Sequence, residues 1–157
     1  MSLHRLETVQ KLPISIDKAW AFLSSPSNLK IITPPHMGFI IHSGFSEGEK
    51  MYAGMVINYT VKPVLGLPMS WVTEITHVEK PNYFVDEQRF GPYSFWHHKH
   101  FLKAIPGGVE MKDIIDYKSP LGPIGDLLNT VLIKGQLKTI FDFRFKKLVE
   151  IFGEWKD

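Results

Sequence analysis

Over most of its middle, the chain alternates between apolar and polar residues with the two-residue period of a β-strand. Five or six runs between residues 36 and 118 are rich in β-branched and aromatic side chains, and Gly, Pro and Asn separate them. Short turns of this kind connect antiparallel neighbours. The pattern predicts an antiparallel meander over Gly38–Ser43, Lys50–Lys62, Met69–Glu79, Tyr83–Phe90, Phe95–Ala104 and Val109–Lys118.

The first third of the chain predicts one strand and two short helices. Residues Leu3–Leu12 alternate loosely, which indicates a strand. Ser15 is typical of a helix N-cap, and the apolar residues from Ala19 to Leu23 would form one face of the helix that follows. A second short helix is expected over Ser27–Ile32, ending at the prolines beyond Thr33.

The last third predicts one long helix of roughly 25 residues, nearly 40 Å in length. We expect a tight loop over Ser119–Gly125 before it, a kink or close approach at Gly135, and a stop at Gly153. A single helix with one apolar stripe must lie across a sheet to bury it, and a sheet curved around it leaves a space between them. The stripe consists of Leu137, Phe141, Phe145, Leu148 and Phe152.

Composition narrows the class of protein. A chain of 157 residues predicts a single domain over 1–157. Its composition, with 44% hydrophobic and 22% charged residues, is that of a folded protein and excludes disorder. The net charge of +2 is too small to indicate nucleic acid binding. The absence of cysteine excludes disulfides and thiolate chemistry. With neither a signal-peptide run nor a membrane-length apolar stretch, we expect a cytoplasmic protein without stable membrane insertion; its oligomeric state stays open.

Candidate chemistry concentrates on the strand at Phe95–Ala104, where three of the seven histidines fall within four residues. Alternation puts Trp96, His98 and His100 on one face, while the other face carries two lysines and is assigned to solvent. On the next strand, Asp113 shares its face with Val109, Met111, Ile115 and Tyr117. A lone buried carboxylate needs a partner, so we expect a hydrogen-bonded Asp113–His100 pair. Asp116 falls on the opposite, wet face.

The strand before these two leaves its orientation open. One face carries Val85, Glu87 and Arg89, and the other carries Asp86, Gln88 and Phe90. Both faces mix apolar and polar residues, so neither is clearly the inner one. If Glu87 points inward, it gathers with His98, His100 and Asp113. The cluster then has three interpretations: a satisfied polar network that orients a ligand, an acid–base centre, or a zinc or iron site. The His-x-His spacing is not specific for metal, so we assign no metal and no cofactor.

Four short motifs accompany this order of elements: Val85-Asp86-Glu87-Gln88, Gly91-Pro92-Tyr93, Trp96-His97-His98 and Tyr117-Lys118-Ser119-Pro120-Leu121-Gly122-Pro123. With these motifs, the order of elements resembles the helix-grip fold of the START and Bet v 1-like (SRPBCC) superfamily, the polyketide cyclase and lipid-transport class, and the motifs are similar to those of its bacterial ligand-binding members. The resemblance implies an α+β fold in which a curved antiparallel sheet wraps around a long C-terminal helix, with two short helices after the first strand.

The resemblance implies a cavity rather than a reaction. We expect it to bind a hydrophobic or amphipathic small molecule of lipid, polyketide or aromatic type. The expected ligand-binding residues are Trp96, His98, His100, Asp113, Glu87, Tyr59, Trp71, Met111, Tyr117 and Phe141.

Two alternative functions stay open. One is a cyclase or dehydratase that uses His98 or His100, set by Asp113, as general acid or base. The other is a protein-interaction module that works through the apolar loop Pro63–Pro68 near Leu65, a loop that could also be a lid. We expect the cations of the last helix to lie on its solvent-exposed face; they are Lys134, Lys138, Arg144, Lys146 and Lys147.

Overall fold

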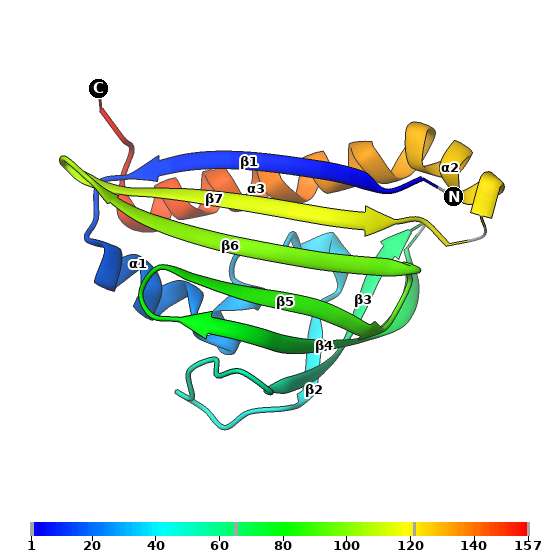
Figure 1. Cartoon of the computed structure of the whole chain (residues 1–157), viewed down its shortest axis with the longest axis horizontal. Coiled ribbons are helices and arrows are strands. Elements are labelled where there is room, and N and C mark those ends of the chain that lie inside the picture. Colours follow the sequence, from blue (N-terminus) through cyan, green and yellow to red (C-terminus); the bar gives the residue numbers. More distant parts are fainter. Residues whose placement is uncertain (1, 65, 121, 157) are drawn as a thin grey trace.

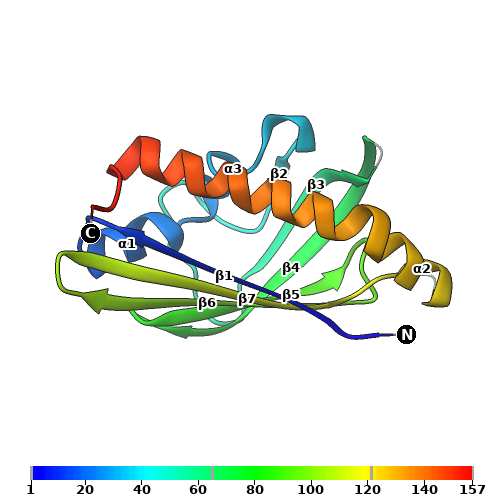
Figure 2. The same ribbon diagram turned by 90° about the horizontal axis from the view of Figure 1, so that it is seen from above.

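The computed structural model describes residues 2–64, 66–120 and 122–156. Within these residues, one antiparallel sheet has the strand order β1-β7-β6-β5-β4-β3-β2, and a long C-terminal helix crosses one of its faces (Figures 1 and 2). The predicted helix-grip architecture is therefore confirmed. The strands are β1 (His4–Leu12), β2 (Ile40–Ser43), β3 (Val56–Val64), β4 (Leu67–Glu79), β5 (Tyr83–Phe90), β6 (Phe95–Ile105) and β7 (Gly108–Lys118).

Short helical segments lie between β1 and β2. Helix α1 (Ile16–Leu23) begins as predicted, because the Ser15 hydroxyl accepts a hydrogen bond from the Lys18 backbone N–H at 3.2 Å. The predicted second helix is instead a 3₁₀ turn, η1 (Pro26–Lys30), and another, η2 (Pro35–Met37), follows it. Both carry proline in the first turn, where its missing N–H costs nothing.

The C-terminal helix begins earlier than the sequence suggested. Helix α2 (Gly122–Leu128) occupies part of the expected loop, the π-helical segment η3 (Asn129–Ile133) follows, and α3 (Lys134–Phe152) completes the run. The loop prediction failed because proline is tolerated in a first helical turn. The expected close approach at Gly135 is also wrong, since a Cβ there would meet nothing within 4 Å. The irregularity lies just before it, in η3.

Strand register aligns the inward-facing residues of three neighbouring strands. His100 of β6 lies opposite Asp113 of β7, and His98 lies opposite Asp86 of β5. As alternation predicted, the inward residues of β7 from Val109 to Tyr117 are buried. Asp116 points outward but is also buried, because Arg5 and Lys99 cover it with a 2.6 Å and a 3.0 Å ion pair.

The segment Pro63–Pro68 is the tip of the β3–β4 hairpin, in which Val64 pairs with Leu67. Leu65 lies outside the described residues, and Leu67 is exposed. Among the described residues, no helix is long and apolar enough to cross a membrane.

Candidate functional site

A cavity of about 180 Å³ lies between the sheet and α3. Most of its wall is apolar: Ile57 and Ile75 come from the sheet, Met37 from η2, and Leu137 and Phe141 from α3. The inward faces of these elements carry large aliphatic and aromatic side chains, so their burial also supplies part of the core. One end of this apolar space is polar.

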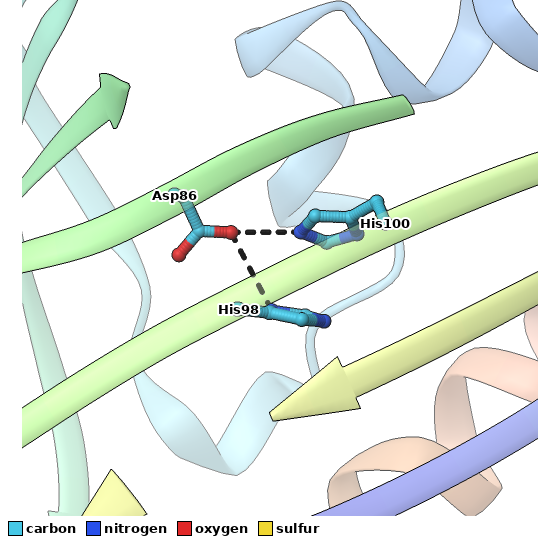
Figure 3. A group of neighbouring side chains, drawn as sticks. All are labelled: Asp86, His98 and His100. Atoms are coloured by element: carbon cyan, nitrogen blue, oxygen red, sulfur yellow. Dashed lines mark hydrogen bonds and ion pairs between the residues drawn. The ribbon is translucent and has the colours of Figure 1, made fainter. Parts of the chain in front are cut away.

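Asp86, His98 and His100 form the polar end, and all three line the cavity. Figure 3 shows Asp86 reaching from β5 toward both imidazoles of β6. Its Oδ2 lies 2.7 Å from Nε2 of His100 and 3.4 Å from Nδ1 of His98. Its Oδ1 accepts a hydrogen bond from the Trp96 indole N–H at 3.3 Å. The two imidazole rings lie 3.7 Å apart, centroid to centroid.

Asp113 lies behind the two histidines. Its Oδ1 is 2.9 Å from Nε2 of His98, in a hydrogen bond, and 2.9 Å from Nδ1 of His100. The second contact is an ion pair, and among the described residues Nδ1 of His100 has no hydrogen-bond partner. The expected hydrogen-bonded pair of Asp113 and His100 is therefore found as a close contact, while the hydrogen bond of Asp113 is made with His98.

Arg144 of α3 supplies the balancing charge. Its Nη1 lies 3.4 Å from Oδ1 of Asp113, and the residue is only 7% exposed. Such burial of a guanidinium is favourable only when an anion compensates it. Two carboxylates, one guanidinium and two imidazoles thus share one buried network.

The network divides its protons unequally between the histidines. Burial opposes charge on both rings, and together with the charge of His100 it lowers the pKa of His98. For His100, the contacts with Asp113 and Asp86 outweigh burial and raise its pKa. Burial favours the neutral form of Asp113, but Arg144 and the two histidines outweigh it and hold its pKa well below the ordinary value. His100 therefore binds a proton more strongly than His98 does.

The pKa of Asp86 is set by the same competition. Burial raises it, but the charge of His98 and the hydrogen bond with His100 bring it below its ordinary value. Asp86 therefore faces the cavity as a carboxylate. The polar end can offer an anion, a cationic imidazole and a neutral imidazole to a bound molecule.

Not every expected binding residue reaches the cavity. Those that line it are Trp96, His98, His100, Tyr59, Trp71 and Phe141. Asp113 lies behind the histidines, while Met111 and Tyr117 pack into the core.

The orientation of Glu87, which the sequence left open, is outward, so Glu87 is not among the ligand-binding residues of the cavity, contrary to expectation. It points to the opposite face, within 3.6 Å of His97 and 3.2 Å of Arg89. Asp86 takes the inward position, because alternation turns adjacent residues to opposite faces.

Arg144 is a second correction. It was grouped with the solvated lysines of the last helix, but it is buried and lines the cavity. A signal was available: Arg144 follows Phe141 by three positions and precedes Leu148 by four, so it lies on the apolar stripe itself.

A group of aromatic rings closes the cavity beyond the histidines. Trp71 lies 5.2 Å from Trp96 and 5.9 Å from Tyr59, centroid to centroid. The Tyr59 hydroxyl shares a 3.0 Å hydrogen bond with that of Thr73, and burial raises the pKa of Tyr59. The indole Nε1 of Trp71 is buried and has no hydrogen-bond partner in the described structure.

No protein family model and no curated protein matches the sequence of this chain. Solved structures do match its fold. A protein from Arthrobacter aurescens has a TM-score of 0.70 at 13% identity, covering 96% of this chain and 92% of that one. Ms6760 from Mycobacterium smegmatis has a TM-score of 0.67 at 16% identity, covering 96% of both. Ara h 8.0201 has a TM-score of 0.63 at 17% identity, covering 96% and 97%.

Proposed function

We propose that this protein, which has the Bet v 1-like helix-grip fold, binds a small amphipathic molecule between its sheet and α3. The apolar part of the ligand contacts the aliphatic and aromatic wall. Its polar part lies toward Asp86, His98 and His100 and offers hydrogen-bond acceptors to the donors around them.

Unpaired donors in the cavity wall carry this proposal. Nε1 of Trp71 and Nε of Arg144 are both buried and have no hydrogen-bond partner among the residues that the structure describes, and both residues line the cavity. Leaving a buried donor unpaired costs about 1–3 kcal/mol. A ligand that carries hydrogen-bond acceptors would recover that free energy. If the wall served only as hydrophobic core, these two N–H donors would contribute nothing to stability.

The volume narrows the class of ligand. A cavity of about 150 Å³ lined by apolar side chains is enough to hold benzene, and the space here is about 180 Å³. It therefore suits one aromatic ring or a short alkyl chain with a polar substituent. Among the ligand types expected from the sequence, a compact aromatic compound fits this size better than a long lipid.

Tryptophan fluorescence tests the proposal, because Trp71 and Trp96 both line the cavity. Phenol, benzoate and hexanoate are titrated into the protein, and mass spectrometry after denaturation identifies any compound that co-purifies. We expect saturable quenching by at least one probe. Trp71→Phe keeps an aromatic ring but removes the N–H, and should weaken binding about 5- to 100-fold. Trp155→Phe, outside the cavity lining, is the matched control. Absence of saturable quenching and of any bound compound would refute the proposal, as would equal affinities for both variants.

Acid–base chemistry on the bound molecule is a second candidate. Its support is the His98–Asp113 hydrogen bond, which holds one ring nitrogen of His98 and leaves the other toward the cavity. A cyclase or dehydratase would act on a carbonyl-bearing compound. In that case His98→Ala should abolish turnover while ligand affinity changes little, and parallel loss of both would count against catalysis.

A further inference from the structure

We propose that Asp86, His98 and His100 hold a divalent first-row transition-metal ion at the polar end of the cavity. The proposal is independent of which organic molecule binds there. The His-x-His spacing in the sequence is too unspecific to indicate a metal, but the structure adds Asp86 as a third ligand beside the two histidines.

The donor atoms stand at distances that suit an ion. Bonds of about 2.1 Å at angles between 90° and the tetrahedral angle separate two ligand atoms by about 3.0–3.4 Å. Oδ2 of Asp86 lies 2.7 Å from Nε2 of His100 and 3.4 Å from Nδ1 of His98, which brackets this range. All three ligand atoms lie within 4.8 Å of one another. The 2.7 Å separation is slightly shorter than in a metal site, and the 4.8 Å limit is longer, so the rings would have to shift when an ion binds.

The groups behind the histidines orient them as metal ligands. A metal-bound histidine usually directs its other ring nitrogen at a carboxylate, which fixes the tautomer. Asp113 occupies that place for His98, since its Oδ1 is hydrogen-bonded to Nε2 at 2.9 Å. The same oxygen lies 2.9 Å from Nδ1 of His100, in an ion-pair contact. The opposite nitrogens, Nδ1 of His98 and Nε2 of His100, are the two that face Asp86. One buried carboxylate thus lies behind both rings and directs that of His98 toward Asp86.

Asp86 is oriented in the same way. The Trp96 indole N–H occupies Oδ1 and leaves Oδ2 directed at the histidines. An ion pair between Asp86 and His100 would be complete without the imidazole of His98 beside it and without the carboxylate of Asp113 behind the two rings. A two-histidine, one-carboxylate metal site uses all of these groups.

The cavity supplies the open coordination positions. The three ligands all line it, so an ion bound by them would face the space of the cavity. Nitrogen and carboxylate donors without thiolate suit zinc, iron(II), cobalt(II) or manganese(II). Metal binding would displace the proton of His100 into solvent, because a ligating imidazole nitrogen must be unprotonated. With both histidines neutral, Asp86, Asp113 and Arg144 together carry one net negative charge. A divalent ion would leave one positive charge, so the site would also accept an anionic group such as hydroxide or carboxylate.

Cobalt(II) and zinc titrations of the chelator-treated protein test the site. We expect one equivalent of Co²⁺ to bind with a visible absorption spectrum, and Zn²⁺ to displace it. Asp86→Asn, His98→Gln and His100→Gln should each weaken binding more than 100-fold. The matched controls are Glu87→Gln and His97→Gln, whose side chains lie on the opposite sheet face; they should bind within twofold of the unaltered protein. Asp113→Asn should cost about 10- to 100-fold.

A second measurement avoids variants that fail to fold. Substoichiometric Mn²⁺ broadens nuclear resonances near its binding site in the unaltered protein. We expect the Trp96 indole N–H signal to broaden first, since it contacts Asp86, while that of Trp155, packed against Gly107 and Gly108, stays sharp. Broadening confined to the exposed histidines, no one-to-one binding, or binding that survives Asp86→Asn would overturn the proposal. None of these outcomes depends on whether phenol, benzoate or hexanoate binds.

Discussion

Replacing Asp113 by asparagine should destabilise the protein more than any other single change of charge on β7. Asp113 is 3% exposed and contacts His98, His100 and Arg144 within 3.4 Å. The substitution keeps the shape of the side chain but leaves the Arg144 guanidinium buried without its anion. Removing one partner of a buried pair costs about 3–5 kcal/mol.

This loss is measurable in two ways. Urea unfolding followed by circular dichroism gives the change in the free energy of unfolding. For a chain of this length, each kcal/mol lowers the melting temperature by about 2–4 °C, so a fall of about 6–20 °C is expected. Both measurements are made in the presence of a chelator, so that metal binding does not contribute.

Asp116→Asn is the control, since Asp116 lies on the same strand three residues away and also pairs with cations. The pKa of Asp116 is lowered, mainly by its hydrogen bond with Arg5. The Arg5 side chain is 56% exposed, and water screens this pair. Asp116→Asn should therefore cost much less than Asp113→Asn. Equal losses in the two variants, or a loss below about 1 kcal/mol for Asp113→Asn, would refute the argument that burial makes the Asp113 network costly to break.

Three further predictions concern pH, packing and backbone. The raised pKa of His100 stabilises the fold below pH 6.5, and this contribution is lost as pH rises through the folded-state pKa. The difference in the free energy of unfolding between the chelator-treated protein and His100→Gln should therefore shrink from pH 6 to pH 9. A difference that widens over this range would contradict the prediction. Leu148→Ala removes a side chain with 0% exposure and should cost about 2–5 kcal/mol in urea unfolding, whereas Ile151→Ala, at 41% exposure, should cost under about 1 kcal/mol. Gly135→Ala has open space in a helix and should raise stability by about 1 kcal/mol, while Gly108→Ala would place its Cβ 2.0 Å from the Leu12 carbonyl oxygen and should lower the melting temperature sharply.

Most of the fold could be predicted because the sheet has one wet and one apolar face. On β7 every second residue except Asp113 is apolar, and this alternation showed which side of the strand is buried. The bounds of β5 were also predicted correctly, at Tyr83 and Phe90, because proline, asparagine and glycine flank it. Helix α2 was missed because its first turn contains the glycine and proline that usually indicate a loop.

The polar end of the cavity was harder to predict, because the residues that form it break the contrast between an apolar and a wet face. On β5, the outward Val85 is buried and shares its face with Glu87, so apolar character did not mark the inner face. The choice between Asp86 and Glu87 depended on the pairing with β6, which a single sequence does not contain. Arg144 is a cation on an apolar stripe, and only its contact with Asp113 explains why it is buried there.

The position of β1 in the sheet has a consequence for how the chain folds during synthesis. Within the sheet that the structure describes, this edge strand pairs with β7 alone, from Leu12 opposite Val109 to His4 opposite Tyr117. Its partner is therefore made about a hundred residues later, and until then the N-terminal strand has no neighbour. Pairings so distant in sequence slow folding, because the loop must close before any contact repays its entropy. On the ribosome, the first strand made would be among the last to join the sheet, and it would depend on chaperones or on its alternating charges to stay unaggregated.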